Sequence, residues 1–188
     1  MSGLLAALDL TDLSHDRFCG PAVPTTLRRS FGGQVAAQAL AAATRTVPKE
    51  QAPHSMHAYF LREADPLAAV ELAVERTRDG GSFCTRQVSA VQSGRTVFVM
   101  LASFHRGDPG PEHAEPAPVV VPAEELPDVE PWPGFVGEWP DWDVRPVPDP
   151  QGMVQQFWFR HRGRLPDDPT VHELGLAYLS DMTLLGVA

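Results

Sequence analysis

The distribution of apolar residues predicts one helix, over residues 31–46, that is buried on nearly all sides. Between Val35 and Ala43 the segment is dominated by alanine, with valine and leucine, so apolar positions cover almost its whole circumference. A helix of that kind is enclosed by other structure, whereas an amphipathic surface helix has a single apolar stripe. The run is far shorter than the roughly 20 apolar residues that span a bilayer. We therefore expect a short helix that is wrapped by protein and that ends before Pro48.

After this helix the periodicity changes to that of strands. Apolar and polar residues alternate, or nearly so, in four successive segments: residues 54–62, 70–79, 83–92 and 95–105. Ser93-Gly94 fits a two-residue hairpin turn between the last two segments. Short connections of this kind favour an antiparallel sheet, and a strongly twisted sheet can wrap a single helix. The predicted fold class is α+β.

Three further elements are predicted outside this helix and sheet. Residues 4–13 have the pattern of a short amphipathic helix, followed by an irregular approach to the buried helix. Residues 154–160 are typical of a strand. Thr170 and Glu173 have the spacing of a capping box, which predicts a helix from Thr170 to about residue 185.

An acidic, proline-rich segment separates two predicted units. Residues 107–150 contain 12 of the 19 prolines and eleven acidic residues against one arginine. We expect an extended, solvated linker there, between an N-terminal unit at residues 1–106 and a second unit at residues 151–188. Three tryptophans are expected to dock parts of the linker on a neighbouring surface, or alternatively to form a ligand platform: Trp132, Trp139 and Trp142.

Charge and cysteine usage limit the function classes. The net charge of −9 belongs to the linker, since the rest of the chain carries 13 acidic and 14 basic residues and so remains compatible with an anionic ligand. Scattered basic residues argue against nucleic acid, and no membrane partner is expected. Cys19 and Cys84 are too few for a disulfide framework or a structural zinc site. They fit a reducing cytoplasm, and the first nine residues lack the features of a secretory leader.

No familiar cofactor or metal motif is present in the sequence. It contains neither a Gly-x-Ser-x-Gly elbow nor a glycine-rich phosphate loop. His54 and His57 are three residues apart in a predicted strand, which places His54 on the face of Phe60 and His57 on the opposite face. We therefore expect no metal and no cofactor.

Several ordered motifs resemble those of the acyl-CoA thioesterase II, or TesB-type, family. They are Phe31-Gly32-Gly33-Gln34-Val35, residues 54–62, Arg78-Asp79-Gly80-Gly81-Ser82-Phe83, Ala102-Ser103-Phe104, Val144-Arg145-Pro146, Leu165-Pro166-Asp167-Asp168 and Leu176-Ala177-Tyr178-Leu179-Ser180-Asp181. The resemblance implies a tandem double hotdog fold, in which each unit is an antiparallel sheet around a central helix. Only one strand and the helix of the second unit are expected here. It also implies hydrolysis of acyl-CoA to free fatty acid and CoA, by a homo-oligomer joined through its sheets.

Asp181 is the candidate general base. The family's catalytic set is an Asp, a Thr and a Gln that hold a water, and only the Asp has a counterpart in this sequence. Independently, Leu174, Tyr178, Asp181 and Leu185 form one stripe of the predicted helix, so the carboxylate would lie on an inward face. The simpler alternative is that Ser180-Asp181 marks the end of the helix. With an incomplete set, the alternative function is a non-catalytic acyl-CoA-binding or assembly module.

Four residues are candidates for contacts with the substrate. The backbone N–H groups of Gly32 and Gly33 are candidate oxyanion donors, although close packing also explains two glycines. His57 is a candidate for the acyl or CoA site, and a packed strand histidine is the alternative. Arg78 is a candidate contact for the CoA phosphates, and a solvated strand end is the alternative.

Overall fold

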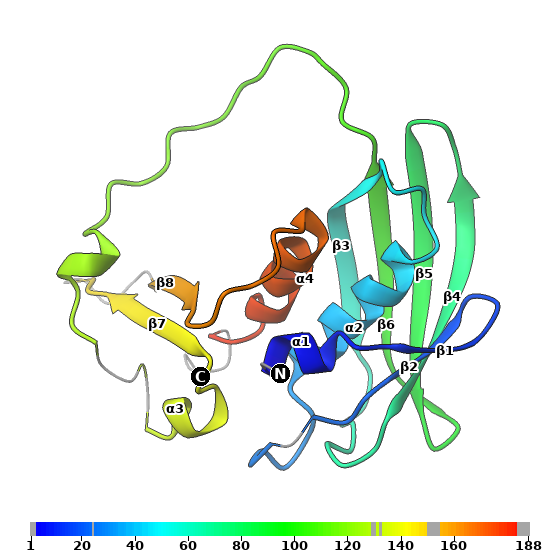
Figure 1. Cartoon of the computed structure of the whole chain (residues 1–188), viewed down its shortest axis with the longest axis horizontal. Coiled ribbons are helices and arrows are strands. Elements are labelled where there is room, and N and C mark those ends of the chain that lie inside the picture. The colour runs from blue at the N-terminus through cyan, green and yellow to red at the C-terminus, as the bar shows by residue number, and fades with distance from the viewer. Residues whose placement is uncertain (1–2, 24, 129–130, 132, 150–154, 184–188) are drawn as a thin grey trace. The chain divides into compact units, whose positions relative to one another are not determined.

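In the computed structural model of the chain, one helix, α2 (Gly32–Thr44), lies against a twisted antiparallel sheet (Figure 1). The structure describes residues 3–23, 25–128, 131, 133–149 and 155–183. Contacts divide the chain into two units, Met1–Asp108 with Pro166–Ala188, and Pro109–Leu165.

The sheet of the first unit has six strands in the order β1-β2-β4-β5-β6-β3, and every neighbouring pair is antiparallel. Its strands are β1 (Thr11–Ser14), β2 (Arg17–Gly20), β3 (Ala52–Phe60), β4 (Val70–Asp79), β5 (Phe83–Gln92) and β6 (Arg95–His105). All residues of α2 from Gly33 to Ala43 are buried. The prediction of a helix enclosed by an antiparallel sheet is therefore confirmed. The turn between β5 and β6 has positive φ at both Ser93 (49°) and Gly94 (72°), as a two-residue hairpin turn of the I′ class requires.

A bulge in β3 corrects the predicted position of His54. The register of β3 against β6 shifts between Pro53 and Ser55, and an extra residue in a strand displaces the alternation of faces. His54 Nε2 lies 2.8 Å from the Ser103 hydroxyl. Because Ser103 alternates with the buried Ala102 and Phe104 on β6, His54 lies on the outer face of the sheet, opposite to the prediction.

The N-terminal segment differs from the predicted helix over residues 4–13. Only α1 (Gly3–Ala7) is helical, and the chain then enters β1. Asp16, with φ of 56°, turns the chain between β1 and β2, and its carboxylate accepts two hydrogen bonds from Arg76 on β4 (2.7 and 2.9 Å). Pairing with the sheet edge thus overrides the local amphipathic pattern.

The last described helix, α4 (Pro169–Leu179), begins and ends differently from the prediction. Its N-cap is Asp168, whose side chain accepts a hydrogen bond from the Thr170 N–H at 2.9 Å. The Asp-Pro pair explains this, because Asp is a strong N-cap and proline suits the first helical position. Ser180 is the C-cap, so the alternative reading of Ser180-Asp181 as a helix end is correct. Leu185 lies outside the described residues.

The unit Pro109–Leu165 contains a small hairpin, which corrects the prediction of an entirely extended linker over residues 107–150. Residues 107–122 are almost entirely exposed and have no helix or strand. The following residues form η1 (Ala123–Glu125), α3 (Phe135–Glu138) and β7 (Trp142–Val147), and β7 pairs with β8 (Gln156–His161). Trp139 and Trp142 are buried in this unit, whereas Trp132 lies outside the described residues.

An ion-pair cluster explains how a proline-rich segment holds this structure. The buried Asp143 carboxylate accepts two hydrogen bonds from Arg145 (3.0 and 3.1 Å) and one from Arg160 (2.8 Å). The hydrogen bonds from Arg145 and, to a smaller extent, the one from Arg160 lower the pKa of Asp143 below its usual value despite burial. Arg145 also donates to the carbonyls of Ala123 and Leu126, which joins the preceding segment to β7.

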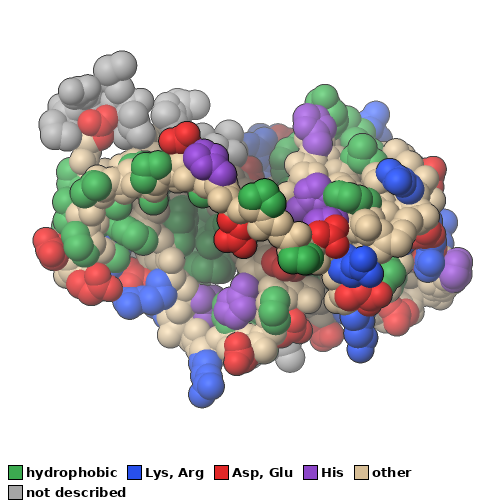
Figure 2. Space-filling model, turned by 90° about the horizontal axis from the view of Figure 1, so that it is seen from above, with side chains coloured by type: hydrophobic (Ala, Val, Ile, Leu, Met, Phe, Trp, Pro, Cys, Tyr) green, Lys and Arg blue, Asp and Glu red, His purple; other side chains and the backbone are tan. Residues whose placement is uncertain are grey.

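Helix lengths and surface charge add two observations. The longest helix that the described residues form is α2, with 13 residues, and none of their helices has the length and apolar character needed to span a membrane. On the face shown in Figure 2, acidic and basic side chains are interspersed.

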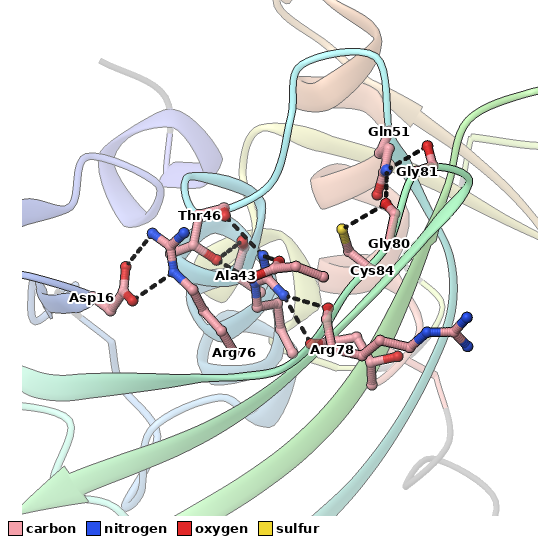
Figure 3. Close-up of polar contacts among 12 residues, drawn as sticks. Asp16, Ala43, Thr46, Gln51, Arg76, Arg78, Gly80, Gly81 and Cys84 are labelled. Atoms are coloured by element: carbon pink, nitrogen blue, oxygen red, sulfur yellow. Dashed lines mark hydrogen bonds and ion pairs between the residues drawn. The ribbon is translucent and has the colours of Figure 1, made fainter.

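A buried guanidinium connects the C-terminal end of α2 to the sheet. Arg86 on β5 is fully buried and donates to the Thr46 hydroxyl (2.8 Å), the Thr46 carbonyl (3.0 Å) and the Arg78 carbonyl (2.9 Å). It also pairs with Asp79. Figure 3 shows these contacts around Thr46. A cation is favoured at this position because the last carbonyls of a helix carry partial negative charge.

We expect Arg86→Met to lower the free energy of unfolding by about 3 kcal/mol, because the buried carbonyls would lose their donor. The measurement is urea denaturation, with Arg95→Met as the control at an exposed position in β6. Equal stability of the two variants would contradict a structural role for the buried guanidinium.

Candidate functional site

Asp181 lies just beyond the end of α4, and its carboxylate reaches the N-terminus of α2. Its Oδ2 atom accepts a hydrogen bond from the backbone N–H of Gly33 at 3.0 Å. No local side chain caps α2, since Phe31 at the N-cap makes no side-chain hydrogen bond there. Asp181 therefore supplies the cap from another part of the sequence, where a carboxylate also interacts favourably with the positive end of the helix.

Two opposing influences set the proton affinity of Asp181. Burial raises the pKa of Asp181 above its usual value, and this is the dominant cause. The N–H of Gly33, the positive charge of Arg29 and the N–H of Gly32 act in the opposite direction, in that order. A partly buried carboxylate with a raised pKa has the character of a general base.

Close packing explains why both residues are glycine. A Cβ atom on Gly33 would collide with the backbone carbonyl oxygen of Tyr178, at less than the 3.0 Å limit of real Cβ contacts. A Cβ on Gly32 would lie 2.5 Å from Asp181 Oδ2 and 2.8 Å from the ring of Phe60. The N-terminus of α2 is thus in direct contact with the C-terminal end of α4.

Helices α2 and α4 run antiparallel. The opposite end of α2, at Ala41 and Thr44, faces the first turn of α4, at Thr170 and Val171, where these residues line one cleft. In this orientation the positive end of each helix dipole lies next to the negative end of the other, which is favourable.

Aromatic rings lie at the N-terminus of α2, where the rings of Phe60 and Phe31 adjoin Gly32 and Gly33. Phe31 and Tyr178 meet edge to face with ring centroids 4.9 Å apart. Phe60, whose side chain is 56% exposed, packs on the buried Phe98 with centroids 5.0 Å apart. The alternation over residues 54–62 placed Phe60 on the face opposite to His57 but did not single it out as a site residue.

The structure does not bring His57 to this site. His57 is exposed on β3, pairs with Leu101 and contacts the ring of Tyr59 at 4.9 Å. It alternates with Met56 and Ala58, which are less exposed, so it lies on the outer face of the sheet. His57 is thus a strand histidine, as in the alternative, but it is exposed and not packed.

Arg78 lies near the other end of α2. Its backbone carbonyl shares the Arg86 guanidinium with Thr46, beyond the C-terminus of the helix. Its side chain is directed away from those contacts in Figure 3. The 13 residues of α2 separate this position from Asp181 by about 20 Å. Among the described residues, no three His, Cys, Asp or Glu side chains are placed to hold a metal ion.

Two family models match the sequence. The model of the acyl-CoA thioesterase N-terminal domain matches residues 21–105, and the acyl-CoA thioesterase model matches residues 135–188. The first match covers α2 and the strands β3 to β6, and the second covers the Asp181 segment.

Individual proteins are similar over nearly the whole chain. Acyl-coenzyme A thioesterase 8 of Homo sapiens is 36% identical, over 96% of this chain and 65% of the human protein. Acyl-CoA thioesterase 2 of Haemophilus influenzae is 32% identical, over 96% of this chain and 70% of the bacterial protein. The crystal structure of acyl-CoA thioesterase II TesB2 from Mycobacterium marinum superposes with a TM-score of 0.84 at 44% identity, covering 98% of this chain and 70% of that one. The chain spans 65% of the length of the human relative.

Proposed function

The chain belongs to the acyl-CoA thioesterase II family, and from that premise we propose that it hydrolyses acyl-CoA thioesters with Asp181 as the general base. The observation that supports this role is the position of the Asp181 carboxylate, which is partly buried, has a raised pKa and is held at the N-terminus of α2. A base needs a fixed orientation and a matched proton affinity, and this position offers both.

The proposed reaction is direct attack by water. Asp181 removes a proton as the water oxygen bonds to the thioester carbonyl carbon, and the carbonyl oxygen becomes an oxyanion. The positive end of α2 stabilises that charge. The intermediate then expels the CoA thiolate, which takes up the proton from Asp181, and the free fatty acid and CoA leave.

The proposed role of Gly33 differs from the one expected from the sequence. Its N–H donates to Asp181, so in this proposal the group orients the base, whereas the sequence suggested a donor to the oxyanion. Loss of this hydrogen bond would free the carboxylate to rotate, and small misplacements of a reacting group are costly in rate.

A hydrolysis assay with a medium-chain acyl-CoA tests the proposal, and its pH dependence tests the base. The base acts only when ionised, so kcat/KM should rise with pH through the raised pKa of Asp181 and then level off.

Arg29→Gln removes a positive charge that lowers the pKa of Asp181, so the rise of kcat/KM should move to higher pH in this variant. Binding of acyl-CoA without turnover would instead support the non-catalytic alternative.

A further inference from the structure

The exposed ring of Phe60 is a direct neighbour of the Asp181 carboxylate. Both lie within 3.0 Å of the point that a Cβ atom on Gly32 would occupy. The absence of a side chain at Gly32 is therefore what allows an apolar ring and the carboxylate to meet at the N-terminus of α2.

The ring of Phe60 is held in place by its packing on β6. Phe60 is the last residue of β3 and pairs with Phe98 on β6, against whose buried ring it packs. The backbone just after Phe60 is held as well, because the N–H of Leu61 donates a hydrogen bond to the carbonyl of Val97 at 2.8 Å. An aromatic side chain with only two rotatable bonds that is held in this way offers a preformed surface at low entropic cost.

The front of the ring is accessible, because the side chain remains 56% exposed. Binding is favoured when an apolar group covers a half-exposed phenylalanine, because apolar surface is removed from water. The part of an acyl-CoA that is apolar and bonded directly to the reacting carbonyl carbon is the acyl chain. Because both the carboxylate and the ring adjoin Gly32, the ring is positioned next to the first carbons of that chain.

We propose that Phe60 contacts the first carbons of the acyl chain and thereby favours substrates with a longer acyl chain over acetyl-CoA. This inference rests on the proposed function of the Asp181 site. Tyr59 provides a matched comparison, since it is the preceding residue on the same strand, is 60% exposed and lies on the opposite face of the sheet, against His57.

The test compares kcat/KM for dodecanoyl-CoA and acetyl-CoA in the full chain and in Phe60→Ala, Phe60→Leu and Tyr59→Ala. Loss of the ring contact should lower kcat/KM for dodecanoyl-CoA about tenfold in Phe60→Ala and change the value for acetyl-CoA by less than about twofold. Phe60→Leu keeps apolar surface and should give an intermediate ratio. Tyr59→Ala should leave the ratio unchanged.

Equal losses on both substrates in Phe60→Ala and Phe60→Leu would overturn the inference, because the ring would then support the structure or the pantetheine arm that every acyl-CoA shares. An unchanged ratio would overturn it as well. In either case, turnover by the wild-type chain would leave the proposed function standing. Failure of the wild-type chain to hydrolyse either substrate would instead refute the proposed function itself.

Discussion

Replacing Asp181 by Asn should lower kcat for acyl-CoA hydrolysis by about 10²- to 10⁴-fold, the range typical of a lost general base. The amide oxygen can still accept the hydrogen bond from Gly33, so the substitution removes proton transfer while preserving the contact with α2. The measurement is steady-state kinetics with a medium-chain acyl-CoA at a pH on the plateau of the wild-type profile.

The same substitution should stabilise the fold at neutral pH. The pKa of Asp181 is raised in the folded state, so the folded chain binds this proton more tightly than the unfolded chain does. The stability contribution is present below the unfolded-state pKa and is lost as pH rises from that value through the raised one. Asn cannot ionise, so the thermal midpoint of Asp181→Asn should exceed that of the wild type above this window.

Glu173→Gln, in α4, is the matched control. Burial, and then the negative charge of Asp168, raise the pKa of Glu173, so this variant should share the gain in stability but keep its turnover. Unchanged turnover in Asp181→Asn would refute the assignment of the base, and equal losses in both variants would assign the effect to α4 as a whole.

Gly33→Ala should disrupt both the packing of the two helices and the site. The added methyl group would collide with the Tyr178 carbonyl oxygen, which belongs to backbone and cannot move aside cheaply. We expect a loss of about 3 kcal/mol in the free energy of unfolding, at the upper end of overpacking effects, together with a loss of turnover as α4 and Asp181 shift.

Gly81→Ala is the control for this substitution, because a Cβ atom at Gly81 would meet nothing within 4 Å. Urea denaturation and kcat would be measured on both variants. If Gly33→Ala matched Gly81→Ala in stability and in rate, the close contact between α2 and α4 could not be the reason for glycine at this position.

The sequence determines most of the first sheet through local signals. The predicted bounds of β5 and β6, and the predicted start of β4, agree with the structure because alternation and turn residues are both local. The bulge that moves His54 to the outer face depends on pairing with β6, which no short pattern contains. The β1–β2 hairpin likewise depends on Arg76, 60 residues from Asp16.

The candidate site was predictable as separate parts but not as an assembly. Asp181 and the Gly32-Gly33 pair stood out in the sequence for different reasons, one as a base and the other as donors to the oxyanion. Their contact depends on the antiparallel placement of α2 and α4. Phe60 joins the site only through that placement, whereas Arg78 is separated from it by the length of α2.

The hydrogen bond from Gly33 to Asp181 spans 148 residues of the sequence. Closing so long a loop carries an entropic cost that must be met before the contact contributes stability. The hairpins of the sheet join near neighbours in the sequence, whereas the position of Asp181 depends on the contact between α4 and α2. If Asp181 is the base, as proposed, activity should therefore depend on the docking of α4 onto α2 as well as on formation of the sheet.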